Sequence, residues 1–174
     1  MSSQDVILGA RVAHVRELKA EVAKLKETNA ALRDEMNSLK AHFDLALLAS
    51  IDLAALPAGG KMVIIDGWNK ILGANRTARD RDDLLKQAKA HIEKCPDDFV
   101  WIVFDGPRAS SQVDGRVRVS YTGGTGLHRA DKMICDFLRM ARWIGKGDKV
   151  EVLTDDKDFL KEIKCQRGRL QACP

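Results

Sequence analysis

The apolar residues in the first third of the chain recur in alternating steps of three and four, which is the heptad spacing of a coiled-coil helix. With Val15 at position a, leucine fills the d positions, and valine at a with leucine at d favours two parallel strands. Asn29 at one a position would fix register and the dimeric state at some cost in stability. The residues with this spacing are Val15, Leu18, Val22, Leu25, Leu32, Met36, Leu39 and Phe43. The pattern predicts a homodimer formed through a parallel coiled coil.

Charged residues flank this apolar stripe in a complementary order. Glu21 and Glu35 at position g would face Lys26 and Lys40 at position e of a parallel partner. The alternative is an amphipathic helix that folds back on its own domain, and such a helix has a wider apolar stripe. The sequence leaves both arrangements open.

After this helix the pattern changes to short apolar runs separated by segments with helical spacing. We expect a coiled-coil helix over residues 1–56, a linker at residues 57–60, where Pro57, Gly59 and Gly60 break the helix, and a second domain over residues 61–174. The 114 residues from 61 to 174 suffice for a small core.

The continuous apolar run at residues 62–65 predicts a strand that is buried on both faces, and residues 99–104 and 150–154 predict two further buried strands. Residues 117–121 alternate in the manner of a half-buried strand, with Arg116 and Arg118 on its wet side. The polar residues 107–115 predict a loop, and residues 165–174 are compatible with a final strand. Strands that alternate with helices predict an α/β fold with a mostly parallel sheet and right-handed crossovers.

Composition narrows the class of protein only a little. The formal net charge of +4 weakly favours a polyanionic partner. The four cysteines form no C-x-x-C pair and have no histidine nearby in ligand spacing, so we expect neither a zinc site nor a disulfide framework. Reduced thiols, and the lack of a signal peptide or a membrane-spanning run, favour a cytoplasmic protein with no membrane partner.

Aspartates follow the three buried strands of the predicted sheet. Asp66, Asp105 and Asp156 come after these strands, and Asp131 opens a helical pattern between the second and the third. Because carboxyl ends of parallel strands meet at one edge, we expect the four side chains to lie close together. Gathered carboxylates repel one another unless a cation or protons relieve the charge, and Mg²⁺ prefers such oxygen ligands. Such a site can support phosphodiester hydrolysis.

Each of these acids also has a purely structural explanation. Asp66 and Asp105 can start turns after their strands, Asp131 and Asp156 can cap helices, and Asp158 suits the first turn of a helix. Their joint placement at one edge of one sheet favours the metal site.

Four ordered motifs within residues 61–168 resemble those of NYN domains, and most closely the YacP-like members of the PIN-like nuclease superfamily. These motifs are VIIDGWN at 63–69, VFDG at 103–106, GLHRADKMI at 126–134, which contains Ala130 and Asp131, and VLTDD at 152–156. The resemblance implies a Rossmann-like, PIN-like sheet and an endoribonuclease that depends on Mg²⁺ or Mn²⁺. It also implies that the catalytic metal ligands are Asp66, Asp105, Asp131 and Asp156. Asn69 would support the first acid by hydrogen bonding, and Asp158 would be a second carboxylate after the last strand.

Basic residues in loops or on exposed faces near this edge form a candidate RNA track, because lysine and arginine hold phosphates. They are Arg76, Arg79, Arg81, Arg108, Arg116, Arg118, His128, Arg129 and Lys132. The alternative is an ordinary solvated surface.

The predicted function is therefore a cytoplasmic, homodimeric, metal-dependent ribonuclease. The coil would pair two nuclease domains on one RNA, or dock the enzyme on a larger RNA–protein assembly such as a ribosome. The alternative from another class is a noncatalytic RNA-binding or scaffold protein that retains the PIN-like fold. A toxin-like nuclease with an antitoxin partner is a third hypothesis.

Overall fold

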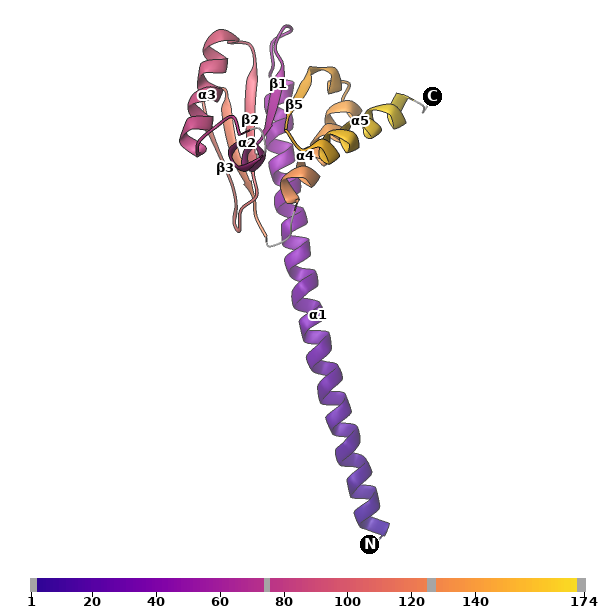
Figure 1. The fold of residues 1–174 in the computed structure, drawn as a ribbon. Coiled ribbons are helices and arrows are strands. Elements are labelled where there is room, and N and C mark those ends of the chain that lie inside the picture. The colour runs from indigo at the N-terminus through magenta and orange to yellow at the C-terminus, as the bar shows by residue number, and fades with distance from the viewer. Residues whose placement is uncertain (1–2, 74–75, 125–127, 172–174) are drawn as a thin grey trace. The chain divides into compact units, whose positions relative to one another are not determined.

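The structure is a computed structural model that describes residues 3–73, 76–124 and 128–171 (Figure 1). Its contacts divide the chain into two units, Met1–Asn37 and Ser38–Pro174. Helix α1 (Ser3–Ala54) contributes to both units. No helix in the described part of the chain combines the length and the apolar character needed to cross a membrane.

The first unit is the N-terminal part of α1, and its apolar stripe is exposed. Leu25 is 55% exposed, Leu32 is 56% exposed and Met36 is 62% exposed. Alanine, leucine, glutamate and lysine dominate this segment and are strong helix formers, so the helix is expected even where side chains have no neighbours in the chain. Coiled-coil dimerisation stays a prediction.

The second unit is built on a five-stranded, mostly parallel sheet, as the strand–helix alternation predicts. The strand order is β3-β4-β2-β1-β5, and only the edge strand β3 runs antiparallel to its neighbour. The elements after α1 are β1 (Met62–Asp66), α2 (Gly67–Leu72), α3 (Arg81–Lys94), β2 (Phe99–Phe104), β3 (Ala109–Asp114), β4 (Val117–Thr122), α4 (Arg129–Trp143), the 3₁₀ turn η1 (Gly147–Lys149), β5 (Val150–Leu153) and α5 (Lys157–Gln171).

Helices cover both faces of the sheet, which explains why every residue of β1 and β2 is buried. On one face, Ile64 and Trp101 pack in a cluster that includes residues of α4 and α5. On the other face, Ile65 and Ile102 pack in a cluster that includes Leu84 of α3 (Figure 1). Alternate residues of each strand therefore enter different halves of the core.

The part of α1 that follows Ser38 belongs to the first of these clusters. Leu45, Ala49 and Leu53 are buried there, and their spacing of four places them on one side of the helix. This segment follows the heptad stripe, whose residues from Val15 to Phe43 are exposed, so both arrangements of that stripe stay open. The second unit therefore includes the end of α1, which comes before the predicted linker at residues 57–60.

Two sequence predictions are wrong. Residues 109–114 form the edge strand β3 instead of a loop, and residues 165–171 continue α5 instead of forming a strand. Strand β3 is polar and mostly exposed because it is bonded on one side only, so it carries none of the apolar signal on which strand prediction depends.

Candidate functional site

Parallel pairing brings the predicted acids to one edge of the sheet. Strand β1 ends at Asp66, β2 ends directly before Asp105, and β5 ends directly before the segment that contains Asp156. Strand β1 lies between β2 and β5 and is parallel to both, so these three carboxyl ends are neighbours. We refer to this region as the acidic edge and define it by Asp66, Asp105, Asp131 and Asp156.

Asp66 is buried at the centre of the acidic edge, with 7% of its surface exposed. Its Oδ1 accepts a hydrogen bond from the backbone N–H of Asn69 at 3.3 Å, which caps α2, and its Oδ2 accepts one from the Thr154 hydroxyl at 3.3 Å. Burial raises the pKa of Asp66 to about 6, and the charges of Asp131 and Asp105 add to the rise. Asp66 therefore interacts electrostatically with two acids that are distant in sequence.

Asp105 connects β2 to the start of α4. Its Oδ1 accepts hydrogen bonds from the backbone N–H of Ala130 at 2.8 Å and from the Thr122 hydroxyl at 3.1 Å. Arg129 lies 4.0 Å from the same oxygen, and it donates a hydrogen bond to the carbonyl of Gly106 at 3.0 Å. Asp105 thus supplies a capping acceptor to a helix whose own N-cap residue provides no side-chain bond.

Asp131 lies in the first turn of α4, where its Oδ2 is 3.1 Å from Nδ1 of His128. Burial raises the pKa of Asp131, the His128 contact opposes this rise, and the charges of Asp156 and Asp105 add to it. Asp131 is therefore electrostatically coupled to the ends of β2 and β5.

Asp156 caps α5, because its Oδ1 accepts hydrogen bonds from the backbone N–H groups of Asp158 at 2.8 Å and Phe159 at 3.0 Å. The Asp158 side chain is 91% exposed and pairs with Lys161 at 2.8 Å, and this contact lowers the pKa of Asp158. Asp158 thus has a local partner of its own on α5.

A groove of about 470 Å³ runs along one side of the acidic edge. Acids and bases line it together, with Asp131 and Asp156 beside Lys132 and Arg139. Asp66 and Asp105 are not among the lining residues. The groove therefore gives solvent access to two of the four predicted ligands.

The donor set of the acidic edge suits a hard divalent ion, since all four side chains offer carboxylate oxygens. Among the described residues, however, no three of these acids bring their oxygen atoms within 4.8 Å of one another. Mg²⁺ usually keeps several waters and is held by one or two carboxylates together with substrate phosphates. The spacing fits an ion held in that way and does not form a closed cage of protein ligands.

Asn69 acts on a different partner from the one expected. Its backbone N–H reaches Asp66, but its side-chain Oδ1 accepts a hydrogen bond from the N–H of Asp155 at 2.6 Å. The Asp155 carboxylate lies 2.9 Å from Nζ of Lys70. Sequence reasoning missed Asp155, Lys70 and Thr154, although the acidic run after β5 marks that segment as important.

The structure corrects the position of two basic residues of the candidate RNA track. Arg118 is buried, and its Nε pairs with Asp52 of α1 at 2.6 Å, because α1 covers the face that the sequence suggests is wet. Arg116 donates a hydrogen bond to the carbonyl of Asp97 at 3.3 Å, which places it at the amino end of the parallel strands. Neither arginine faces the acidic edge.

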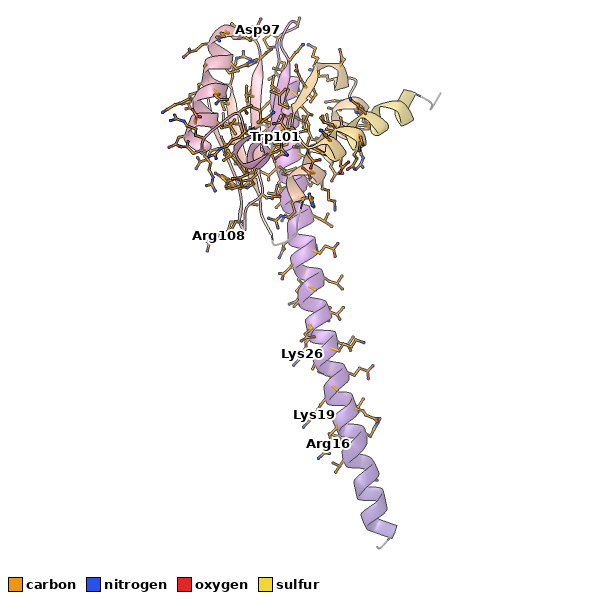
Figure 2. All side chains as sticks on the ribbon, viewed as in Figure 1. Arg16, Lys19, Lys26, Asp97, Trp101 and Arg108 are labelled. Atoms are coloured by element: carbon orange, nitrogen blue, oxygen red, sulfur yellow. The ribbon has the colours of Figure 1, made fainter. Side chains whose placement is uncertain are left out.

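The other basic residues lie on exposed or partly exposed parts of the surface. Arg76 donates to the carbonyl of Arg79, whose own side chain pairs with Asp83 at 3.5 Å. Arg108 is exposed at the end of the compact unit opposite to Asp97 (Figure 2). The residues closest in the chain to the acids of the edge are Arg108, His128, Arg129 and Lys132.

An aromatic group beside the acidic edge was not expected from the sequence. Trp68 and Tyr121 flank Phe104, with ring centroids 5.1 Å and 5.4 Å from it, and the Arg81 guanidinium lies 4.6 Å from the Trp68 ring. The Trp68 indole N–H donates a hydrogen bond to the carbonyl of Asp105 at 2.7 Å. Phe104 is buried, whereas Trp68 and Tyr121 are partly exposed, and exposed aromatic rings can stack on nucleic-acid bases. The sequence could have indicated this aromatic group, because its three rings lie at or just after the ends of the predicted strands β1, β2 and β4.

Comparison of the chain with protein-family models, curated proteins and solved structures gives no match. The fold itself defines an α/β protein with a five-stranded, mostly parallel sheet and a long N-terminal helix. Residues 125–127 of the glycine-rich segment before α4, and with them part of the third motif, lie outside the described residues.

Proposed function

We propose that the chain is a divalent-metal-dependent endoribonuclease of the NYN/PIN-like type, with its catalytic centre at the acidic edge. The observation that supports this function is the convergence of Asp66, Asp105, Asp131 and Asp156. They come from distant parts of the chain; burial chiefly raises the pKa values of Asp66 and Asp131, and the charges of the neighbouring acids add to both rises. Such repulsion costs stability, and a bound cation would relieve it.

In this proposal each acid has a defined place. Asp131 and Asp156, which line the groove, would hold the ion, and Asp66 and Asp105 would complete its surroundings through water. Bound Mg²⁺ or Mn²⁺ would stabilise the charge on the phosphate oxygens and activate the attacking water. Arg108, outside the groove, would hold the RNA backbone.

The groove offers a further cation for the RNA backbone. Lys132 lines it beside His128 and the two acids, so a phosphate in the groove would meet the Lys132 ammonium and the proposed ion together. These contacts would position the RNA without selecting its sequence.

Cleavage of labelled single-stranded and structured RNA tests the activity. With Mg²⁺ or Mn²⁺ the wild type should cut and EDTA should stop it, whereas Asp66→Asn and Asp156→Asn should lower the rate by about 100-fold or more, as loss of a transition-state contact does. Asp114→Asn is the matched control, because Asp114 is an exposed acid at the opposite end of the sheet that pairs with Lys89. Equal trace cutting by the wild type and both edge variants would sink the proposal.

We further propose that the first unit forms a parallel homodimer. Its exposed stripe has the a and d pattern, and complementary charges at g and e support the parallel register. The dimer would present two catalytic centres to one RNA. Docking of the same helix on a larger RNA–protein assembly is the competing use of this surface.

A noncatalytic RNA-binding function is the second candidate, and one observation favours it. Asp66, Asp105 and Asp156 each accept a backbone hydrogen bond at the start of a helix, so structure alone gives a reason to keep them. A mobility-shift experiment in EDTA, run beside the cleavage assay, separates the two. RNA binding without cutting in either metal would support this second function.

A further inference from the structure

A second cluster of metal-ligating side chains lies away from the acidic edge. His91 is in the last turn of α3, Cys95 follows the helix directly, and Asp98 precedes β2. Nε2 of His91 is 2.9 Å from Oδ2 of Asp98, and the ligand atoms of the three residues all lie within 4.8 Å of one another. The expectation that no histidine stands in ligand spacing to a cysteine is therefore wrong here.

This cluster belongs to the opposite end of the sheet from the acidic edge. Asp98 precedes β2 and Asp105 follows it, and a strand rises by about 3.3 Å per residue, so the two ends are about 20 Å apart. Figure 2 agrees, since Asp97 and Arg108 are at opposite ends of the compact unit, with Trp101 between them. Metal binding here would be independent of the proposed nuclease site.

We propose that His91, Cys95 and Asp98 form a Zn²⁺ site. Imidazole nitrogen, thiolate sulfur and carboxylate oxygen are together the donors that zinc takes, whereas Mg²⁺ and Ca²⁺ prefer oxygen alone. Donor atoms around tetrahedral zinc are about 3.3–3.6 Å apart, given the usual Zn–N, Zn–O and Zn–S lengths. The three donors need only small adjustments to reach that spacing, and a water would take the fourth position.

The simpler explanation is a hydrogen bond between His91 and Asp98 that joins the end of α3 to the start of β2 without a metal. Two further features favour a metal. Cys95 is exposed and adds a third donor of a different chemical kind. Oδ1 of Asp98 accepts the backbone N–H of Lys61 at 2.8 Å, which holds the carboxylate in place as outer partners of metal ligands do.

Zinc binding would have a structural effect. The ion would join the end of α3 to the start of β2, and through Lys61 to the residue that precedes β1. The thiol proton, and the imidazole proton where present, would be released to solvent on binding. Since the unfolded chain lacks this arrangement, the ion would stabilise the native state.

The chain is first treated with EDTA and then titrated with Zn²⁺. Isothermal titration calorimetry of this step tests the site directly. Substitution with Co²⁺ should give the absorption band of a cobalt–thiolate bond. Cys95→Ser should abolish this band, and His91→Gln and Asp98→Asn should each weaken Zn²⁺ binding by at least about 10-fold. Zn²⁺ should also raise the thermal midpoint of the wild type and leave that of Cys95→Ser unchanged.

Three controls make the outcome specific. Asp97→Asn changes a neighbouring acid, a Cys165→Ser/Cys173→Ser double variant removes two other thiols, and Asp66→Asn changes the acidic edge; all three should bind Zn²⁺ as the wild type does. The proposal is overturned if the wild type takes up no Zn²⁺, or if Cys95→Ser and His91→Gln bind it with unchanged affinity. Circular dichroism shows whether each variant is folded. The Zn²⁺ titration of the wild type tests the site even if a variant does not fold.

Discussion

The side-chain oxygen of Asn69 accepts a hydrogen bond from the backbone N–H of Asp155 at 2.6 Å, and this bond ties α2 to the segment after β5. Asp156 is the next residue, so the position of one predicted ligand depends on an amide from another element. The bond joins two of the motifs that carry the family resemblance.

Asn69→Ala should therefore lower metal-dependent cleavage more than it lowers stability. A lost hydrogen bond of this kind costs about 1 kcal/mol of unfolding free energy, while the released segment would misplace Asp156. Urea unfolding and the cleavage rate are the two measurements. Gln87→Ala is the control, since Gln87 donates a comparable bond to the carbonyl of Thr77, away from the acidic edge. Equal loss of activity in both variants would contradict the prediction.

The raised pKa of Asp66 predicts how stability depends on pH. The folded protein holds this proton up to about pH 6, whereas the ordinary value is 3.8, so stability should fall as pH rises through this range. Asp66→Asn should remove this dependence and, above pH 6 in EDTA, raise the unfolding free energy by up to about 3 kcal/mol. Urea unfolding at pH 5 and at pH 7.5 measures it. A variant no more stable than the wild type at pH 7.5 would refute the argument.

The buried pair of Arg118 and Asp52 predicts a large effect on stability. Arg118→Met should cost up to about 3–5 kcal/mol, because it leaves the largely buried Asp52 carboxylate without its partner. The double variant Asp52→Leu/Arg118→Met should recover most of this loss, since no unpaired charge then remains. Chemical unfolding of the single and double variants gives the coupling energy. Additive losses would show that the two residues are not coupled.

Arg108 is the contrasting arginine, because it is exposed near the acidic edge. Arg108→Ala should leave stability unchanged, weaken RNA binding for all sequences, and reduce the slope of log affinity against log salt by about one. Filter binding in EDTA at several salt concentrations is the measurement. Arg116→Ala, at the other end of the sheet, should change neither the affinity nor the slope. If both variants behave alike, the RNA does not track along the acidic edge.

The proposed dimer depends on the exposed stripe of the first unit. Leu25→Asp places a charge at a d position and should convert the dimer to a monomer at working concentrations, as sedimentation velocity would show. Ala20→Asp introduces the same charge at an f position, outside the contact, and should leave the dimer intact. A monomeric wild type would remove this part of the proposal.

The centre of the α/β framework could be predicted from the sequence, because strands β1 and β2 are buried on both faces and form continuous apolar runs, whereas the edge strand β5 is buried only in part. The runs that contain Ile64 and Trp101 are of this kind. Strand β3 could not be predicted, since its pairing depends on backbone groups and its side chains remain in water. The inward packing of α1 after Ser38 could not be predicted, because the heptad pattern ends at Phe43 and does not say what buries Leu45, Ala49 and Leu53.

The sequence predicted that the acids meet at one edge of the sheet. It did not predict which side chains form hydrogen bonds or ion pairs with one another. Topology alone brings Asp66 and Asp105 together, because parallel strands share their carboxyl ends. The pairing of Arg118 with Asp52 depends on a helix that is distant in sequence, which no local pattern encodes. The closeness of His91 to Asp98 likewise arises where a turn reverses the chain.

The helix-capping roles of Asp66, Asp105 and Asp156 constrain how this fold can change over evolutionary time. Alanine at Asp105 or Asp156 would remove a helix-capping acceptor and cost about 1 kcal/mol, so a descendant without activity at the acidic edge would still tend to retain these two acids. Among the described residues, Asp131 accepts no backbone hydrogen bond at a helix start. Its substitution would therefore cost less unfolding free energy than that of Asp105 or Asp156. Under the proposed nuclease function, substitution of Asp131 would be the first change expected in a descendant that no longer cleaves RNA.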